Sequence, residues 1–385
     1  MERIYLDANA TTPLLPEVFD AMRPFLLENF GNASSTHRQG QHARAAIDHA
    51  RESIAALLCC RASELVFTSG GTESDNLALA GVLTAGDHLI ISAVEHHAVL
   101  HAAQALAQRG VELTILPCDA RGLIAPEDLT SALRSNTRLV SIMFANNETG
   151  VLQPIAELAH ITKAHGALFH TDAVQAAGKL SIDLANELRD VDLLSISGHK
   201  MYAPQGVGVL FVRRGLSLTP LFHGGSHERQ RRAGTENVAG IAALGKAASI
   251  AEQWLRQIDA ADSPAHLEPL RNRLEETLIA DISNAGVNGR GAARTINTAN
   301  LFFDGVDAEA LLIALDLKGI AVSAGSACQS GASEPSHVLS AMGITHERAK
   351  SSVRISLSRL TTSAQVDRVL EVLPAAVARL RDRRS

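Results

Sequence analysis

The sequence lacks the features that mark several classes of protein. Its four cysteines are too few for a disulfide framework in 385 residues, so we expect a reducing cytoplasmic location. No apolar run reaches the ~18 residues that span a bilayer. The start, "MERIYLDANATT", has no basic stretch followed by an apolar one, so we expect no export signal. A formal net charge of −6 argues against a general role on nucleic acids or anionic membranes.

The composition that remains is that of a globular protein, with 46% hydrophobic and 20% charged residues. Short apolar segments that resemble buried strands alternate with helical patterns such as "TESDNLALAGVL" and "IAELAHITKAHG". This alternation predicts an α/β fold with a mostly parallel central sheet flanked by helices. The predicted strands are residues 64–69, 88–94, 111–117, 138–145, 166–172, 191–197 and 206–213.

The pattern changes after Arg213. A loop rich in glycine and arginine leads into a mainly helical stretch over about 238–280, which Ser263-Pro264 interrupts. The remaining residues indicate a compact α+β unit. Since single cores stop growing near ~250–300 residues, we expect two domains. The large domain would span 14–260, and the small α+β domain would combine 1–13 with 261–385.

Polar residues follow five of the predicted strands. They are Gly70-Gly71-Thr72-Glu73, Glu95-His96-His97, Asn146-Asn147-Glu148, Asp172 with Gln175, and His199-Lys200. In open α/β sheets, ligands bind beyond the carboxyl ends of the strands. Five polar clusters at one such edge predict an active site.

The chemistry of these clusters narrows the choice of cofactor. Gly71-Thr72 at a helix start could bind a phosphate, although an ordinary helix cap explains it equally well. A nucleotide is poorly supported without GxxxxGK[ST] or GxGxxG. His97 and His101 have the spacing of zinc ligands but lack HExxH, so a packed or solvated pair is the better interpretation. A lysine, a phosphate site and a carboxylate together favour pyridoxal phosphate.

Lysine is scarce, and only Lys200 lies at a strand's carboxyl edge within the polar clusters. An amine that is partly desolvated there can lose its proton and form a Schiff base. For the other lysines a solvated charge on a helix or loop is the simpler expectation. These are Lys163, Lys179, Lys246, Lys318 and Lys350.

Of the cysteines, Cys328 differs from the rest in its surroundings. Cys59 and Cys60 end an apolar helical stretch and are expected to pack in the core, and Cys118 is expected to be structural. Cys328 lies in "SAGSACQSGASEPS", a loop of small and polar residues that buries little, so we expect a thiol that can move.

Motifs along almost the whole chain resemble those of the cysteine desulfurases, in the NifS/IscS branch of the class V aminotransferases with pyridoxal-phosphate fold type I. They include "YLDANATTP", "FTSGGTESDNLA", "VEHHAVL", "NNETGVLQPI", "HTDAVQAAGK", "SGHKMYAPQGVGVL", "RRAGTENV" and "SAGSACQSGASEPSHVL". They occur in the order typical of the family.

The resemblance implies a role for each matching residue. Lys200 would be the Schiff-base lysine, and His96 would stack on the cofactor ring and assist proton transfer. The other implied cofactor ligands are Asp172 at the pyridine nitrogen, Gln175 at the phenolic oxygen, Asn147 beside the cofactor, and Gly71, Thr72, Ser197 and His199 at the phosphate. Asn147 and Arg354 would hold the substrate carboxylate, and Thr235 would reach the phosphate of a partner subunit in a homodimer.

The implied reaction converts L-cysteine to L-alanine and leaves a persulfide on Cys328, whose sulfur passes to an acceptor such as an iron–sulfur scaffold protein. Three alternatives remain open. A selenocysteine lyase would prefer selenocysteine, and a transaminase would need a keto acid and no nucleophilic cysteine. A non-catalytic scaffold would not need the lysine, acid and cysteine together.

Overall fold

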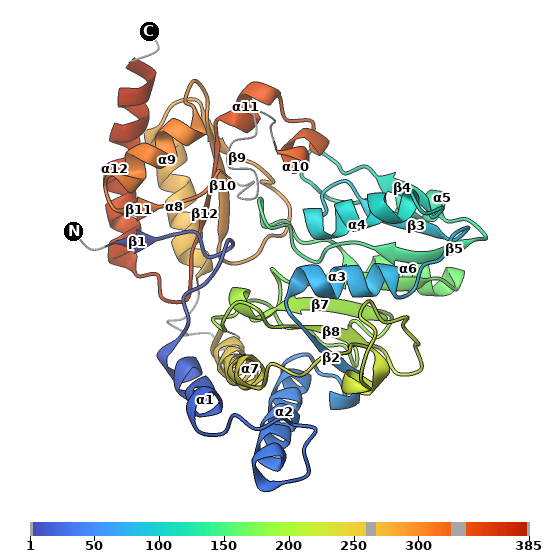
Figure 1. The fold of residues 1–385 in the computed structure, drawn as a ribbon. Coiled ribbons are helices and arrows are strands. Elements are labelled where there is room, and N and C mark those ends of the chain that lie inside the picture. The colour runs from blue at the N-terminus through green and yellow to red at the C-terminus, as the bar shows by residue number, and fades with distance from the viewer. Residues whose placement is uncertain (1–2, 259–266, 325–335, 383–385) are drawn as a thin grey trace.

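The computed structural model describes residues 3–258, 267–324 and 336–382. Figure 1 shows a large and a smaller β-sheet with their helices. The strands are β1 (Ile4–Tyr5), β2 (Leu65–Thr68), β3 (His88–Ser92), β4 (Glu112–Leu116), β5 (Thr137–Ser141), β6 (Leu168–Asp172), β7 (Leu193–Ser197), β8 (Gly208–Val212), β9 (Ala285–Val287), β10 (Thr298–Phe303), β11 (Ile320–Ala321) and β12 (Ser352–Ser356). The helices are α1 (Pro16–Leu27), α2 (Arg38–Leu57), α3 (Gly71–Ala80), α4 (His97–Ala107), α5 (Pro126–Ala132), α6 (Ile155–His165), α7 (Val238–Ile258), α8 (Glu268–Asp281), α9 (Ala308–Asp316), α10 (His337–Ala341), α11 (His346–Lys350) and α12 (Ser363–Asp382).

The large sheet contains all seven strands that the sequence predicts, in the order β2-β8-β7-β6-β5-β3-β4. Strands β4, β3, β5, β6 and β7 run parallel, and β8 is antiparallel to both of its neighbours. The predicted α/β class with a mostly parallel sheet is therefore confirmed. Because β2 and β7 both run opposite to β8, the carboxyl ends of six strands lie at the same edge of the sheet.

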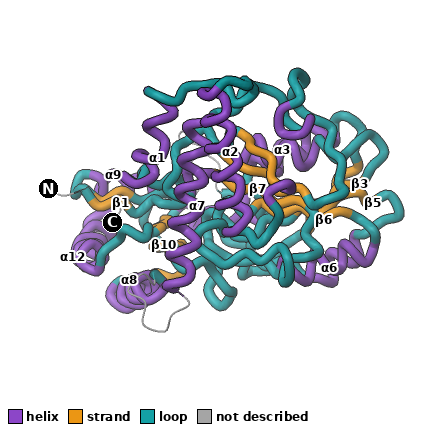
Figure 2. The backbone as a smooth tube through the Cα atoms, turned by 90° about the horizontal axis from the view of Figure 1, so that it is seen from below, coloured by secondary structure: helices purple, strands orange, loops and turns teal. Residues whose placement is uncertain are grey.

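Helices cover both faces of the large sheet, which is why β2, β3, β7 and β8 are buried along their whole length. Leu139 packs in the core under α3 and α4, whereas its neighbour Val140 packs in the core of the opposite face, with α2, α6 and α7. Figure 2 shows α1, α2 and α7 side by side across that second face.

The smaller antiparallel sheet has the order β12-β10-β9 and shares a separate hydrophobic core with α8, α9 and α12. The start of the chain joins this unit, since Ile4 pairs with Ile320 and Asp7 bridges to Ser356. The domain limits given above stay a prediction, and Ser263-Pro264 lies outside the described residues.

The expectation that Cys59 packs in the core is wrong. Helix α2 ends at Leu57, and Cys59 follows in a left-handed conformation with φ of 50° and an exposed side chain. Cys60 and Cys118 are partly buried against the core. Within the described residues, no helix combines the length and apolarity needed to cross a membrane.

Candidate active site

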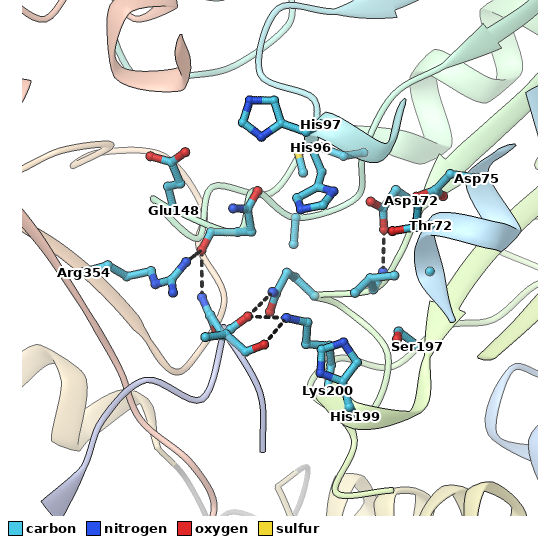
Figure 3. Close-up of a pocket in the computed structure, with 18 of the residues that line it drawn as sticks. Thr72, Asp75, His96, His97, Glu148, Asp172, Ser197, His199, Lys200 and Arg354 are labelled. Carbon is cyan, nitrogen blue, oxygen red and sulfur yellow. Dashed lines mark hydrogen bonds between the residues drawn. The ribbon is translucent and has the colours of Figure 1, made fainter. Parts of the chain in front are cut away.

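A cavity of about 290 Å³ lies beyond the carboxyl ends of the parallel strands. Of the predicted site residues that the structure describes, all except Thr235 line it, and Figure 3 labels several of them. These residues come from segments far apart in the chain. They are Gly71, Thr72, His96, Asn147, Asp172, Gln175, Ser197, His199, Lys200 and Arg354.

Lys200 ends a single 3₁₀ turn, Gly198–Lys200, that directly follows β7. Its Nζ donates hydrogen bonds to the backbone oxygens of Asn9 and Ala10, both at 2.6 Å. These two residues follow β1, so the N-terminal segment closes one side of the cavity. The sequence reasoning missed this contact because backbone carbonyls carry no residue signature.

An anion would fit at the start of α3. Among the described residues no side chain caps this helix, so its first N–H groups keep the capacity to bind an anion. A Cβ atom at Gly71 would come within 2.8 Å of Val174 Cγ2, so the close approach there requires glycine. The hydroxyl-bearing residues Thr72 and Ser197 line the same end of the cavity.

His199 lies beside this anion site in its neutral form. Burial lowers its pKa to about 4, and the positive charge of Lys200 adds to the shift. Its Nδ1 lies 3.1 Å from the hydroxyl of Thr11. A neutral imidazole here contributes a hydrogen bond rather than a positive charge.

Two buried carboxyl groups line the cavity, Asp172 at the end of β6 and Asp75 on α3. Burial raises the pKa of Asp172 to about 6, although the N–H of Val174, which donates to its Oδ1 at 2.9 Å, and the charge of Lys200 lower it. Burial and the charge of Asp172 raise the pKa of Asp75 well above its usual value. The protonated pyridine nitrogen of a pyridoxal phosphate bound here would place a further positive charge beside Asp172.

His96 caps the start of α4 and is held as one tautomer. Its Nδ1 accepts a hydrogen bond from the N–H of Ala98 at 3.1 Å. Burial lowers its pKa to about 4, with Lys200 and the nearby histidines adding to the effect. The neutral ring therefore carries its proton on Nε2 and can donate from that atom.

Arg354 on β12 lies on the opposite side of the cavity from Thr72 and Asp172 (Figure 3). It is only 2% exposed. Its Nη2 forms an ion pair with Asp7 Oδ1 at 2.7 Å, and its Nη1 donates to the backbone oxygen of Asn147 at 2.9 Å. The guanidinium group is thereby fixed before any substrate carboxylate arrives.

The structure adds cavity residues that the sequence reasoning did not select. Asp75 could have been noticed as an acid on a largely buried helix, and Glu148 belongs to the polar cluster after residues 138–145, but His337 gives no local signal. His337 packs against His97 with ring centroids 4.7 Å apart, and His97 lies 4.8 Å from His101. No group of three metal-binding side chains gathers anywhere in the described part of the chain.

The expectation of a solvated Lys179 is wrong. Its Nζ donates to Gln175 Oε1 at 2.6 Å, and burial lowers its pKa to about 7, with smaller effects from Lys200 and Arg354. The turn that follows β6 folds the lysine back onto Gln175.

Thr235 is not among the lining residues. Thr235 is exposed and borders a separate small cavity with Phe67 and Gly206. Cys328 lies outside the described residues. The described residues that flank its segment adjoin the site, since the backbone of Ser323 pairs with that of Arg354 and His337 lines the cavity.

Comparisons with known proteins identify the family of the chain. Residues 4–369 match the family model described as aminotransferase class-V. "Cysteine desulfurase IscS" of Methanosarcina thermophila is 47% identical over 98% of this chain and 93% of its own length, and "Cysteine desulfurase" of Trichormus azollae is 48% identical over 99% and 94%. The solved structure titled "NIFS-LIKE PROTEIN" superposes with a TM-score of 0.90 at 35% identity, covering 98% of this chain and all of that one. The chain therefore belongs to the class V aminotransferase family and, within it, to the cysteine desulfurases of the NifS/IscS branch.

Proposed function

We propose that this cysteine desulfurase works with pyridoxal phosphate held in the cavity of Figure 3. One observation carries the proposal. A single cavity joins the amine of Lys200, the uncapped start of α3 and the buried carboxyl group of Asp172. These are the three groups that the cofactor's aldehyde, phosphate and ring nitrogen require.

Each lining residue then has a task. Arg354 and Asn147 bind the carboxylate of L-cysteine, for which a guanidinium fork is suited. The cofactor, when bound, supplies an electrophilic carbon for amines and a ring that accepts electron density. Lys200 removes the proton from Cα as a free amine. His96 holds a proton on Nε2, ready to donate to the departing group or to the product.

Sulfur transfer is assigned to Cys328. Its thiolate forms a bond to the substrate sulfur while the carbon–sulfur bond breaks, and protons return to carbon. The balance is one L-cysteine and one thiol to one L-alanine and one persulfide. A solved relative titled "SspA in complex with cysteine", 35% identical over 93% of this chain with a TM-score of 0.80, supports the choice of substrate. We also propose that the protein forms a homodimer and passes its sulfur to an acceptor protein such as an iron–sulfur scaffold. A cytoplasmic location is proposed as well, and the free thiols of Cys59, Cys60 and Cys118 support that location.

The test separates sulfur transfer from the remaining chemistry. Cys328→Ser is expected to bind the cofactor and to change its absorption spectrum when L-cysteine is added. Alanine formation should fall by orders of magnitude, because an alcohol is a poor nucleophile at neutral pH. Cys118→Ser is the control and should keep most activity. Alanine release by Cys328→Ser at the wild-type rate would contradict the proposal.

Two further assays address the alternatives. Lys200→Ala should stay folded but lose the covalent, borohydride-trapped link to the cofactor. Turnover of L-cysteine without a keto acid would exclude a transaminase. Faster turnover of selenocysteine than of cysteine would instead favour the lyase.

A further inference from the structure

The turn after β6 places two side chains four residues apart against each other. The N–H groups of Ala176 and Ala177 bond to the oxygen of Ala173, and those of Lys179 and Leu180 bond to the oxygen of Ala176. This run of tight turns brings Lys179 back towards Gln175. The distance from Lys179 Nζ to Gln175 Oε1 is 2.6 Å, which is a short hydrogen bond.

The side-chain amide of Gln175 can adopt only one orientation in these surroundings. It is 5% exposed, and its Nε2 donates to the backbone oxygen of Asn9 at 2.9 Å. The carbonyl oxygen of Asn9 only accepts, which requires Nε2 towards Asn9, and Oε1 then accepts from an N–H of Lys179. An amide without Lys179 would lose one of these two hydrogen bonds.

The side-chain amide of Gln175 lies close to the Nζ of Lys200. The oxygen of Asn9 that accepts from Gln175 also accepts from Lys200 Nζ at 2.6 Å, so the amide nitrogen and the lysine lie around one atom. Gln175 lines the cavity, and its Nε2 carries a second N–H that makes no hydrogen bond to the described residues. That N–H is available to an acceptor on a bound molecule.

We propose that Lys179 is a positioning residue, which fixes the amide of Gln175 so that its N–H faces the oxygen that a bound cofactor carries next to its reactive carbon. The proposal rests on the proposed use of pyridoxal phosphate. Lys179 acts through Gln175 and does not touch the reacting atoms. The fall in its pKa, caused by burial and by Lys200 and Arg354, agrees with an amine enclosed at the site rather than exposed to solvent.

The test uses the purified protein with bound pyridoxal phosphate and titrates its visible absorption with pH. When the N–H of Gln175 no longer donates to the cofactor oxygen, the anionic form of that oxygen is disfavoured. Lys179→Met should therefore raise the pH midpoint of the absorption change by about one unit, and it should weaken cofactor binding about 10-fold. Lys179→Arg, which keeps a cationic donor, should restore most of both values. Lys163→Met is the matched control, because Lys163 pairs with Asp192 away from the cavity, and it should change neither.

A double-mutant cycle tests the route of the effect. In a Gln175→Ala background, Lys179→Met should add little further shift. A full additional shift there would overturn the positioning role, as would an unchanged midpoint in folded Lys179→Met. If Lys179→Met does not fold, Lys179→Gln gives the same test. The introduced amide can turn either its oxygen or its nitrogen towards Gln175, so it does not impose one orientation on Gln175. A wild-type protein without a Lys200-dependent visible absorption would refute the proposed cofactor instead.

Discussion

At the scale of single residues, burial raises the pKa of several carboxyl groups at and near the site, and Glu95 is the example with the clearest consequence for stability. Glu95 is fully buried, and its Oε1 accepts hydrogen bonds from the N–H of Met143 at 2.8 Å and from the hydroxyl of Ser92. Burial raises its pKa to about 8, although these hydrogen bonds lower it. A buried acid that lacks a cationic partner remains protonated.

This shift predicts a pH dependence of stability. The unfolded chain releases the proton of Glu95 near its ordinary pKa, whereas the folded chain keeps it up to about pH 8. The contribution of Glu95 to stability is therefore complete below about pH 4.5 and declines as the pH rises towards 8. Glu95→Gln keeps the accepting oxygen and cannot ionise. Between pH 5 and pH 8, wild type should lose on the order of 1–3 kcal/mol of unfolding free energy relative to the variant. Urea unfolding at pH 5 and pH 8 measures this difference. The same change in unfolding free energy for wild type and Glu95→Gln between the two pH values would contradict the expectation.

At the scale of elements, the turn His227–Gln230 carries backbone strain. Glu228, Arg229 and Gln230 are all left-handed, with φ of 46°, 56° and 66°. Such conformations cost roughly 1–2 kcal/mol for each residue other than glycine. The turn is fixed by Glu228, whose carboxylate pairs with Arg51 at 2.7 and 3.0 Å and accepts from the N–H of Phe67 at 3.0 Å.

Removal of this anchor should be costly. Glu228→Gln leaves the buried guanidinium of Arg51 without its anion, and we expect a loss of about 3–5 kcal/mol in urea unfolding. Glu112→Gln is the matched control, because its pair with Arg134 is half exposed and contributes at most about 1 kcal/mol. Equal losses in the two variants would show that the Arg51–Glu228 pair does not hold the turn.

At the scale of the whole molecule, Thr235 is exposed and borders a different cavity from the one lined by the other described site residues. It follows the strained turn in the same arginine-rich loop. A role in a partner subunit's site predicts a stable dimer in sedimentation analysis. Thr235→Ala should weaken cofactor binding about 10-fold, through one lost hydrogen bond to a charged group. Thr219→Ala, a second exposed threonine, is the control and should have no effect.

A mixed dimer tells whether Thr235 acts across subunits. When a Thr235→Ala subunit pairs with a Lys200→Ala subunit, action across the interface leaves one site with both residues intact. That site should bind the cofactor with wild-type affinity. Action within one subunit would leave no intact site in the mixed dimer. A monomer with full cofactor occupancy would also contradict the prediction.

The sequence by itself determined the large sheet and most of its functional edge. Strand periodicity and β–α alternation are local signals, and a parallel sheet necessarily gathers its strand ends, so Lys200, Asp172 and His96 could be expected together. Arg354 was found only through the family resemblance. The exposed Cys59 was missed because the end of α2 depends on packing, which local apolarity does not report.

Only the tertiary structure decided which groups control those residues. Lys200 donates to the backbone oxygens of Asn9 and Ala10, and Arg354 pairs with Asp7. Asp75 lies close enough to Asp172 for their charges to interact. Each of these interactions joins segments that lie far apart in the chain. Lys179 is close to Gln175 in sequence, but its burial depends on the surrounding fold. The sequence shows which functional group each residue carries. The charge state and orientation of that group depend on hydrogen bonds and desolvation, because these are set by residues that come into contact only in the folded protein.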